Sequence, residues 1–272
     1  MKHISRIYLF LIFGILYIPI LTLILFSFNS ENSTASFAGF DLKWYIELFN
    51  SPETFTALRN TLILAVLSSL IATVIGTAAA EGIYKMKNKI VKAAINSVTN
   101  IPMMNPDIVT GMSMMLFFVV VAGILRVSYN DMGFVAMLIA HITFCLPYVI
   151  LSVLPRITEF GDSLSEAALD LGCTPMQAFF KVKLPNIMHG VVSGFVMAFT
   201  LSLDDFVISY FVGSSKFQTL PLLIYSMTKK KVTPDMYALS TLIIITIFAL
   251  LLFSNIRSGK EEERRRRKGA KK

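Results

Sequence analysis

Two adjacent carboxylates, Asp204 and Asp205, lie in the apolar stretch FTLSLDDFVISYF, residues 199–211. A carboxylate in membrane hydrocarbon costs about 3 kcal/mol or more, so such residues usually face a cavity, a partner or a substrate. Phe206 and Tyr210 follow within a few residues. Carboxylates attract cations, and aromatic faces add cation–π contacts. The pattern therefore has the chemistry of a contact site for a cation.

The direction of each carboxylate depends on the helix that carries it. Neighbouring residues of a helix point about 100° apart, so in a regular helix the two acids lie on different faces. Asp205 then shares a face with the small residues Gly190, Gly194, Ala198 and Ser202. The GxxxG spacing in this set lets two helices approach closely. We expect Asp204 to face a pathway about 25 Å above the start of the helix, and Asp205 to face a helix neighbour.

Two other interpretations of the acid pair are open. A break in the helix near Leu203 would expose both carboxylates together. Alternatively, both acids pair with basic side chains and only stabilise the fold. The candidate partners for such ion pairs are Arg59, Arg126 and Lys216.

The composition is that of an integral membrane protein. Hydrophobic residues make up 55% of the 272 residues and charged residues 15%, and the mean hydropathy is +0.67. Soluble domains carry about 25% charged residues. An all-α fold is expected, since about 20 apolar residues span the hydrocarbon as a helix. The six candidate spans are roughly 8–28, 58–84, 107–126, 134–154, 187–210 and 236–256.

The basic residues predict the orientation and exclude nucleic acid as the expected partner. With both termini in the cytoplasm, the inner segments hold 18 Lys and Arg and the outer segments seven. This bias is typical of residues that face anionic inner-leaflet lipid. We expect a first helix and outer segment over 1–57, the main transmembrane domain over 58–256 and a charged cytoplasmic tail over 257–272.

The longest inner connection, residues 155–186, predicts two short helices that meet at a glycine turn. Ser163 or Ser165 is expected to cap the first helix, and Gly172 to end it. Thr174 caps the second helix and Pro175 takes its first position. Pro185 is expected to close the second helix before the membrane.

No catalytic, metal or cofactor site is expected. Cys145 and Cys173 lack metal-ligand spacing and are predicted to be unpaired. His141 has no His or Cys at ligand spacing, so a hydrogen-bonded packing role is favoured. Glu81, near the inner end of the second span, is expected to lie close to Lys85. No GxxxxGK[ST] phosphate loop occurs in the sequence, so we do not expect this chain to hydrolyse ATP.

The inner connection carries a family resemblance. The stretch EAALDLGCTPMQAFFKVKLP resembles the EAA motif of ATP-binding-cassette (ABC) importer permeases, with Val where the family usually has Ile. The matching residues are Glu166, Ala167, Ala168, Gly172, Val182, Leu184 and Pro185. The resemblance implies the type I importer fold, in which this EAA loop couples the membrane helices to ATPase subunits. It also implies a homologous permease partner, two ATP-binding subunits and an external substrate-binding protein.

Further stretches are similar to permeases of spermidine/putrescine importers: FTALRNTLILA, IPMMNPDIVTG, HITFCLPYVI, FTLSLDDFVISYF and LPLLIYSM. The similarity implies a polyamine substrate in the cytoplasmic membrane, with Asp204, Asp205, Phe206 and Tyr210 along its path. Permeases for iron, thiamine, opines or phosphonates share the EAA loop, so importers of those solutes are the alternatives. An ion-coupled secondary transporter is a further alternative, but it leaves the EAA-like loop without a role.

Overall fold

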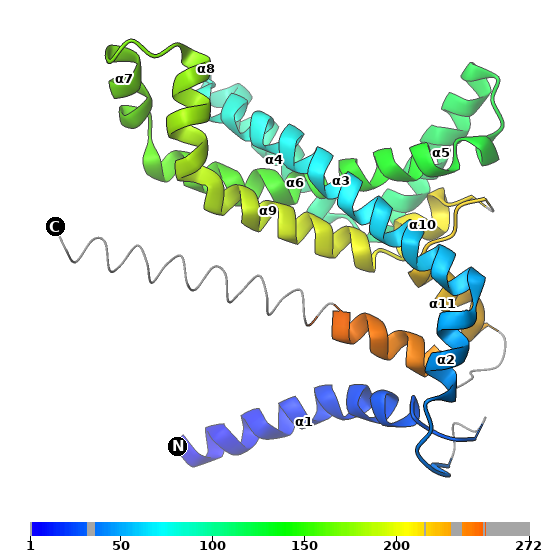
Figure 1. Cartoon of the computed structure of the whole chain (residues 1–272). Coiled ribbons are helices and arrows are strands. Elements are labelled where there is room, and N and C mark those ends of the chain that lie inside the picture. The colour runs from blue at the N-terminus through cyan, green and yellow to red at the C-terminus, as the bar shows by residue number, and fades with distance from the viewer. Residues whose placement is uncertain (1, 32–35, 215, 230–235, 247, 249–272) are drawn as a thin grey trace. The chain divides into compact units, whose positions relative to one another are not determined.

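A computed structural model describes residues 2–31, 36–214, 216–229, 236–246 and 248 (Figure 1). Within these ranges the regular structure is helical, and the only β pairings are two isolated bridges, Asn29 with Phe40 and Ser214 with Phe217. The prediction of an all-α fold is confirmed. The helices are α1 (Lys2–Phe26), α2 (Lys43–Asn50), α3 (Pro52–Lys85), α4 (Lys89–Met104), α5 (Asp107–Leu125), η1 (Tyr129–Asp131), α6 (Gly133–Phe160), α7 (Ser163–Asp170), α8 (Pro175–Ala178), η2 (Phe179–Lys183), α9 (Leu184–Asp204), α10 (Val207–Val212) and α11 (Leu220–Thr228).

Five helical segments of the described chain are long and apolar enough to cross a membrane. They are Tyr8–Phe26, Pro52–Lys85, Asp107–Leu125, Gly133–Phe160 and Pro175–Asp204. Each coincides with one of the first five predicted spans. The sixth, 236–256, is described only over residues 236–246 and 248, where Met236–Thr246 is an apolar helix. The tail 257–272 lies outside the described residues.

The chain forms two compact units. One contains residues 58–219, and the other contains the flanking segments, up to Ala57 and from Leu220 onward. The domain ranges expected from the sequence, 1–57, 58–256 and 257–272, stay predictions. In that second unit Leu48, Leu223 and Leu239 share a small apolar core.

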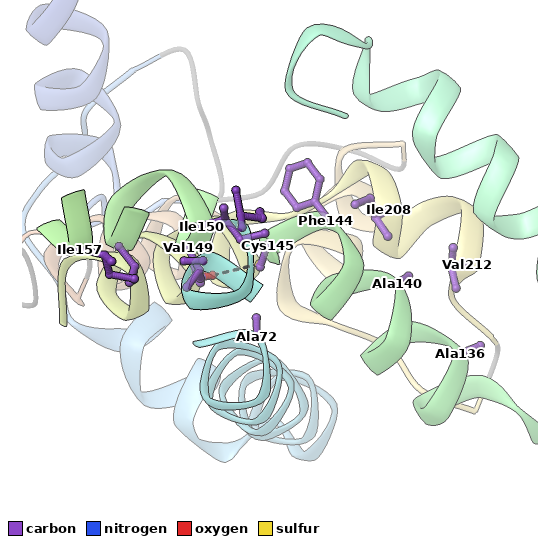
Figure 2. Packing of buried hydrophobic residues seen from close by; sticks show 14 of the residues in the cluster. Ala72, Ala136, Ala140, Phe144, Cys145, Val149, Ile150, Ile157, Ile208 and Val212 are labelled. Atoms are coloured by element: carbon purple, nitrogen blue, oxygen red, sulfur yellow. Dashed lines mark hydrogen bonds between the residues drawn. The ribbon is translucent and has the colours of Figure 1, made fainter. Parts of the chain in front are cut away.

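The core of the 58–219 unit forms where α6 packs along α9 and where α10 packs against α5 and α6. Figure 2 shows Ala140, Phe144 and Val149 of α6 near Ile208 of α10 and Ala72 of α3. All five side chains are apolar and buried, so the crossing helices bury a continuous apolar surface.

The small-residue face predicted for α9 lies at the contact with α6. Gly190, Gly194, Ala198 and Ser202 are all buried. A Cβ built on Gly190 would lie 2.9 Å from the backbone oxygen of Ser152. The absence of a side chain at this position therefore sets how closely α6 and α9 approach, as the GxxxG spacing predicts.

One expectation about the helices is wrong, and one helix was not predicted. Pro185 does not end a helix: α8, η2 and α9 form one helical segment, Pro175–Asp204. Pro185 is the second residue of α9, which follows the π-helical turn η2 directly. The chain between the second and third spans, where the sequence analysis placed no helix, forms the 16-residue helix α4, which Asn88 caps by accepting from the N–H groups of Ile90 and Val91.

Candidate functional site

The helix that carries the acid pair breaks between its two carboxylates. α9 ends at Asp204, and the backbone of Asp205 is extended, with φ −66° and ψ 120°. The Asp205 carboxylate accepts hydrogen bonds from the N–H groups of Ile208 at 3.1 Å and Ser209 at 2.8 Å. These N–H groups lie in the first turn of α10 and have no partner within that helix. Asp205 therefore caps α10.

A buried polar network surrounds Asp205. Nε2 of His141 lies 3.4 Å from the Asp205 carboxylate, and Nδ1 of His141 lies 2.7 Å from Oγ of Ser202. Ser202 in turn hydrogen-bonds Ser68 at 2.8 Å. His141, Ser68 and Ser202 are buried, and the side chain of Asp205 is 7% exposed. The network joins α3, α6 and α9 to the start of α10, and it confirms the hydrogen-bonded role expected of His141.

Asp204 lies in a different environment. It is exposed at the end of α9, whereas Asp205 turns inward. The ring centroids of Phe206 and Tyr210, just beyond the break, are 5.5 Å apart, and Tyr210 is 45% exposed. The helix breaks close to Leu203, as one of the two interpretations predicted, but the break does not expose both carboxylates together: Asp204 is exposed and Asp205 turns inward.

The proposed ion-pair partners are not found. Among the described residues no ion pair joins either acid to Arg59, Arg126 or Lys216; Lys216 lies 2.5 Å from Asp131 instead. Nor does any group of three or more His, Cys, Asp or Glu side chains in the described chain have the arrangement of a metal site. Both cysteines are free, and Cys145 belongs to the apolar core.

The EAA loop folds at the opposite end of α9 from the acid pair (Figure 1). α7 and α8 meet at Gly172, whose φ of +85° is readily adopted only by glycine. Glu166 and Ala167 are exposed on α7, and Ala168 is buried. Val182 lies in η2, while Leu184 and Pro185 begin α9.

The EAA loop exposes several large apolar side chains among its polar ones. Leu171, Met176 and Phe180 are exposed, with Leu171 at 87%. Exposed apolar side chains gathered on a short segment are typical of a protein–protein contact.

The predicted cap of α8 is confirmed, and the predicted cap of α7 is wrong. Thr174 forms a capping box with Gln177: its hydroxyl accepts from the Gln177 N–H at 3.3 Å, and the Gln177 side chain accepts from the Thr174 N–H at 3.1 Å. Ser163 and Ser165 do not cap α7. Asp162 occupies the cap position there, with no side-chain hydrogen bond to the helix.

Thr174→Ala is expected to destabilise the start of α8 by about 1 kcal/mol, since the hydroxyl acceptor is lost. Amide hydrogen exchange at Gln177 and Ala178 should quicken by roughly fivefold. Ser163→Ala is the matched control, because no cap bond depends on it. Equal acceleration in both variants would contradict the role of the capping box.

The sequence reasoning missed two members of the network around Asp205. Ser68 and Ser209 lie in apolar stretches and gave no separate signal. An aspartate followed by a helix start is the one local hint of the cap, since aspartate is a favoured residue there.

Comparison with known proteins identifies the family. Residues 72–258 match the model for the inner membrane component of binding-protein-dependent transport systems. This chain belongs to that family. It is thus a multi-pass inner membrane component, and the long apolar helices agree with this assignment.

Several relatives of this membrane component are polyamine permeases. It is 37% identical to the spermidine/putrescine permease protein PotC of Haemophilus influenzae, over 92% of this chain and 94% of the relative. It is 38% identical to PotC of Escherichia coli, over 90% of each chain. The E. coli putrescine permease protein PotI is 37% identical over 85% of this chain and 82% of its own.

Solved structures establish the fold of this membrane component. A bacterial ABC transporter involved in alginate import has a TM-score of 0.75 and 18% identity, over 95% of this chain and 98% of that one. The MetNI methionine ABC transporter has a TM-score of 0.60 and 20% identity, over 75% of this chain and 95% of that one. The prediction of the type I ABC importer fold is confirmed.

Proposed function

We propose that this chain is the membrane-spanning permease subunit of an ATP-driven importer for polyamines such as spermidine and putrescine. One observation carries the substrate class: relatives named for spermidine and putrescine transport align over about nine-tenths of the chain, and the alignment spans the acid pair. A protonated polyamine is a flexible polycation, so a route for it needs carboxylates that replace lost hydration and rings that give cation–π contacts.

Asp204 is the side chain proposed to meet the cation. It is exposed at the end of α9, with Phe206 and Tyr210 just beyond it. Asp205 shapes the route indirectly, because its carboxylate caps α10 and so fixes the chain at the break. A route must also release its cargo, and a single exposed carboxylate binds a cation more weakly than a buried pair does.

The proposed partners follow from the EAA loop. Its exposed apolar side chains Leu171, Met176 and Phe180 fit docking into a groove of a separate ATP-binding subunit. A homologous permease completes the membrane domain, two ATP-binding subunits hydrolyse ATP, and an external binding protein delivers the polyamine. The chain supplies no catalytic residue. Both termini are proposed to face the cytoplasm, which puts the EAA loop on the ATPase side.

Transport is proposed to proceed by alternating access. Closure of the ATP-binding subunits displaces the EAA loop. Because α8, η2 and α9 are one helical segment, a displacement of the loop moves α9 and the break at its far end. The acid pair is thereby turned from one side of the membrane toward the other.

The deciding experiment is ATP-dependent uptake of labelled spermidine by the full importer in proteoliposomes. Asp204→Asn removes the charge with little change of shape, and we expect uptake to fall about tenfold, since a charge-assisted contact to the cation is lost. Asp131→Asn is the matched control, because that carboxylate is exposed and pairs with Lys216. Normal uptake by Asp204→Asn, with normal assembly, would remove Asp204 from the route.

The same assay separates the alternatives. Excess thiamine, iron, an opine or a phosphonate should not compete with labelled spermidine. Uptake that persists without ATP or the ATP-binding subunits would favour an ion-coupled secondary transporter.

A further inference from the structure

Lys183 is a buried cation at the inner end of the 58–219 unit. Its side chain is 5% exposed. Nζ lies 2.9 Å and 2.8 Å from the two carboxylate oxygens of Glu81. It also lies 3.6 Å from the Asp162 carboxylate and 4.7 Å from the centre of the Tyr84 ring. A lysine is rarely buried in this way unless it is paired.

The partners of Lys183 belong to three separate parts of the chain. Glu81 and Tyr84 lie at the inner end of α3, and Asp162 directly precedes α7, the first helix of the EAA loop. Lys183 itself ends the π-helical turn that leads into α9. π-Helical turns occur frequently at functional sites. One side chain thus contacts α3 and the start of the EAA loop, and it is part of the segment that continues as α9.

A second lysine approaches the same carboxylate but differs in burial. Lys85 lies 3.0 Å from Glu81, one helical turn away, as its sequence position predicts. Its side chain is 66% exposed, so solvent screens the pair and the contact joins α3 only to itself. Lys183 therefore provides a buried ionic link between α3 and the EAA loop, beside the hydrogen bond between Tyr84 and Asp162.

We infer that Lys183 is a positioning residue that joins the EAA loop to the inner end of α3, so that displacement of the loop moves α3 together with α9. This inference rests on the proposed function, in which an ATP-binding subunit displaces the loop. Without the buried contact, α9 still follows the loop through the continuous helix, but α3 is joined to the loop more weakly, through Tyr84 and Asp162. ATP hydrolysis then proceeds with less transport.

The test uses the full importer with its ATP-binding subunits. In Lys183→Met we expect spermidine uptake per ATP hydrolysed to fall about tenfold, which is an ordinary size for coupling between two sites. The rate of ATP hydrolysis should stay within about twofold of the wild-type rate. Lys85→Met is the matched control and should leave the ratio unchanged. Glu81→Leu combined with Lys183→Met removes both charges, so no unpaired charge stays buried and assembly should be recovered even if the single variant is unstable.

The double variant separates positioning from stability. If it assembles and still hydrolyses ATP without matching uptake, the inference stands. If it recovers the wild-type ratio, Lys183 serves stability alone and the inference is overturned.

Hydrogen exchange of residues 162–172 in the assembled importer gives a readout that needs no substrate. We expect faster exchange in Lys183→Met than in Lys85→Met, because Asp162 loses its contact with Lys183 and the loop is held to α3 more weakly. Absence of spermidine uptake by the wild type would refute the proposed substrate and leave this readout intact. Equal exchange in both variants would refute the joining role of Lys183 whatever the transported solute.

Discussion

Asp205→Ala is expected to lower the free energy of unfolding by about 3 kcal/mol, the largest effect among the single changes considered. The substitution removes the acceptor of two N–H groups at Ile208 and Ser209, both fully buried. It also removes the carboxylate that His141 faces at 3.4 Å. Loss of a helix cap costs about 1 kcal/mol, and each buried group left without a partner costs about 1–3 kcal/mol. Thermal or denaturant unfolding of the purified protein in detergent measures the change.

Asp204→Ala is the control beside it. Asp204 is exposed and ends α9, so its loss should change the free energy of unfolding by about 0.5 kcal/mol or less. The destabilisation by Asp205→Asn should lie between those of Asp204→Ala and Asp205→Ala. An amide keeps one acceptor oxygen, but it presents a donor to the other N–H. Similar destabilisation by Asp204→Ala and Asp205→Ala would contradict the separate roles inferred for the two acids.

Gly190→Ala is expected to destabilise the protein by about 2 kcal/mol through overpacking where α9 crosses α6. The added Cβ would lie 2.7 Å from Cγ of Arg156 and 2.9 Å from the backbone oxygen of Ser152. The arginine side chain can move aside, but the backbone oxygen moves only with α6. The two helices must therefore separate, and the buried contacts along them loosen. The midpoint of thermal unfolding in detergent measures the loss.

Two other glycines make this a graded test. At Gly194 the nearest atom to a new Cβ is the Cα of Val149, at 3.3 Å, so Gly194→Ala should cost less than Gly190→Ala. At Gly82, in α3, no atom lies within 4 Å of a new Cβ, and Gly82→Ala should stabilise the helix by roughly 0.5–1 kcal/mol. A different order of stability among the three variants would show that the close approach of α6 does not control the destabilisation.

Features that depend on neighbouring residues were predictable from the sequence. Apolar runs of sufficient length indicate the first five spans, because a helix in hydrocarbon must satisfy its own backbone hydrogen bonds. Thr174 caps α8 and Gly172 turns the chain before it, since both effects act within a few residues. Two local predictions were wrong: Pro185 lies within a continuous helix, and Ser163 does not cap α7.

The amphipathic helix α4 was also missed. It lacks a long apolar run, and a search for membrane spans is insensitive to a short helix with a mixed surface. Its capping residue, Asn88, was a local signal that could have indicated its start.

The sequence by itself determined the membrane class, the places of the first five spans and the EAA loop, and it put two acids at the end of the fifth span. Only the tertiary structure decided what surrounds each acid, because the residues that contact one another lie far apart along the chain. Asp205 meets His141 of α6, and Lys183 meets Glu81 of α3, separations of 64 and 102 residues. Such contacts depend on how helices cross, and helix crossing is set by packing of whole faces rather than by local spacing. The acid pair is thus one exposed carboxylate, Asp204, beside one that holds the chain at the break.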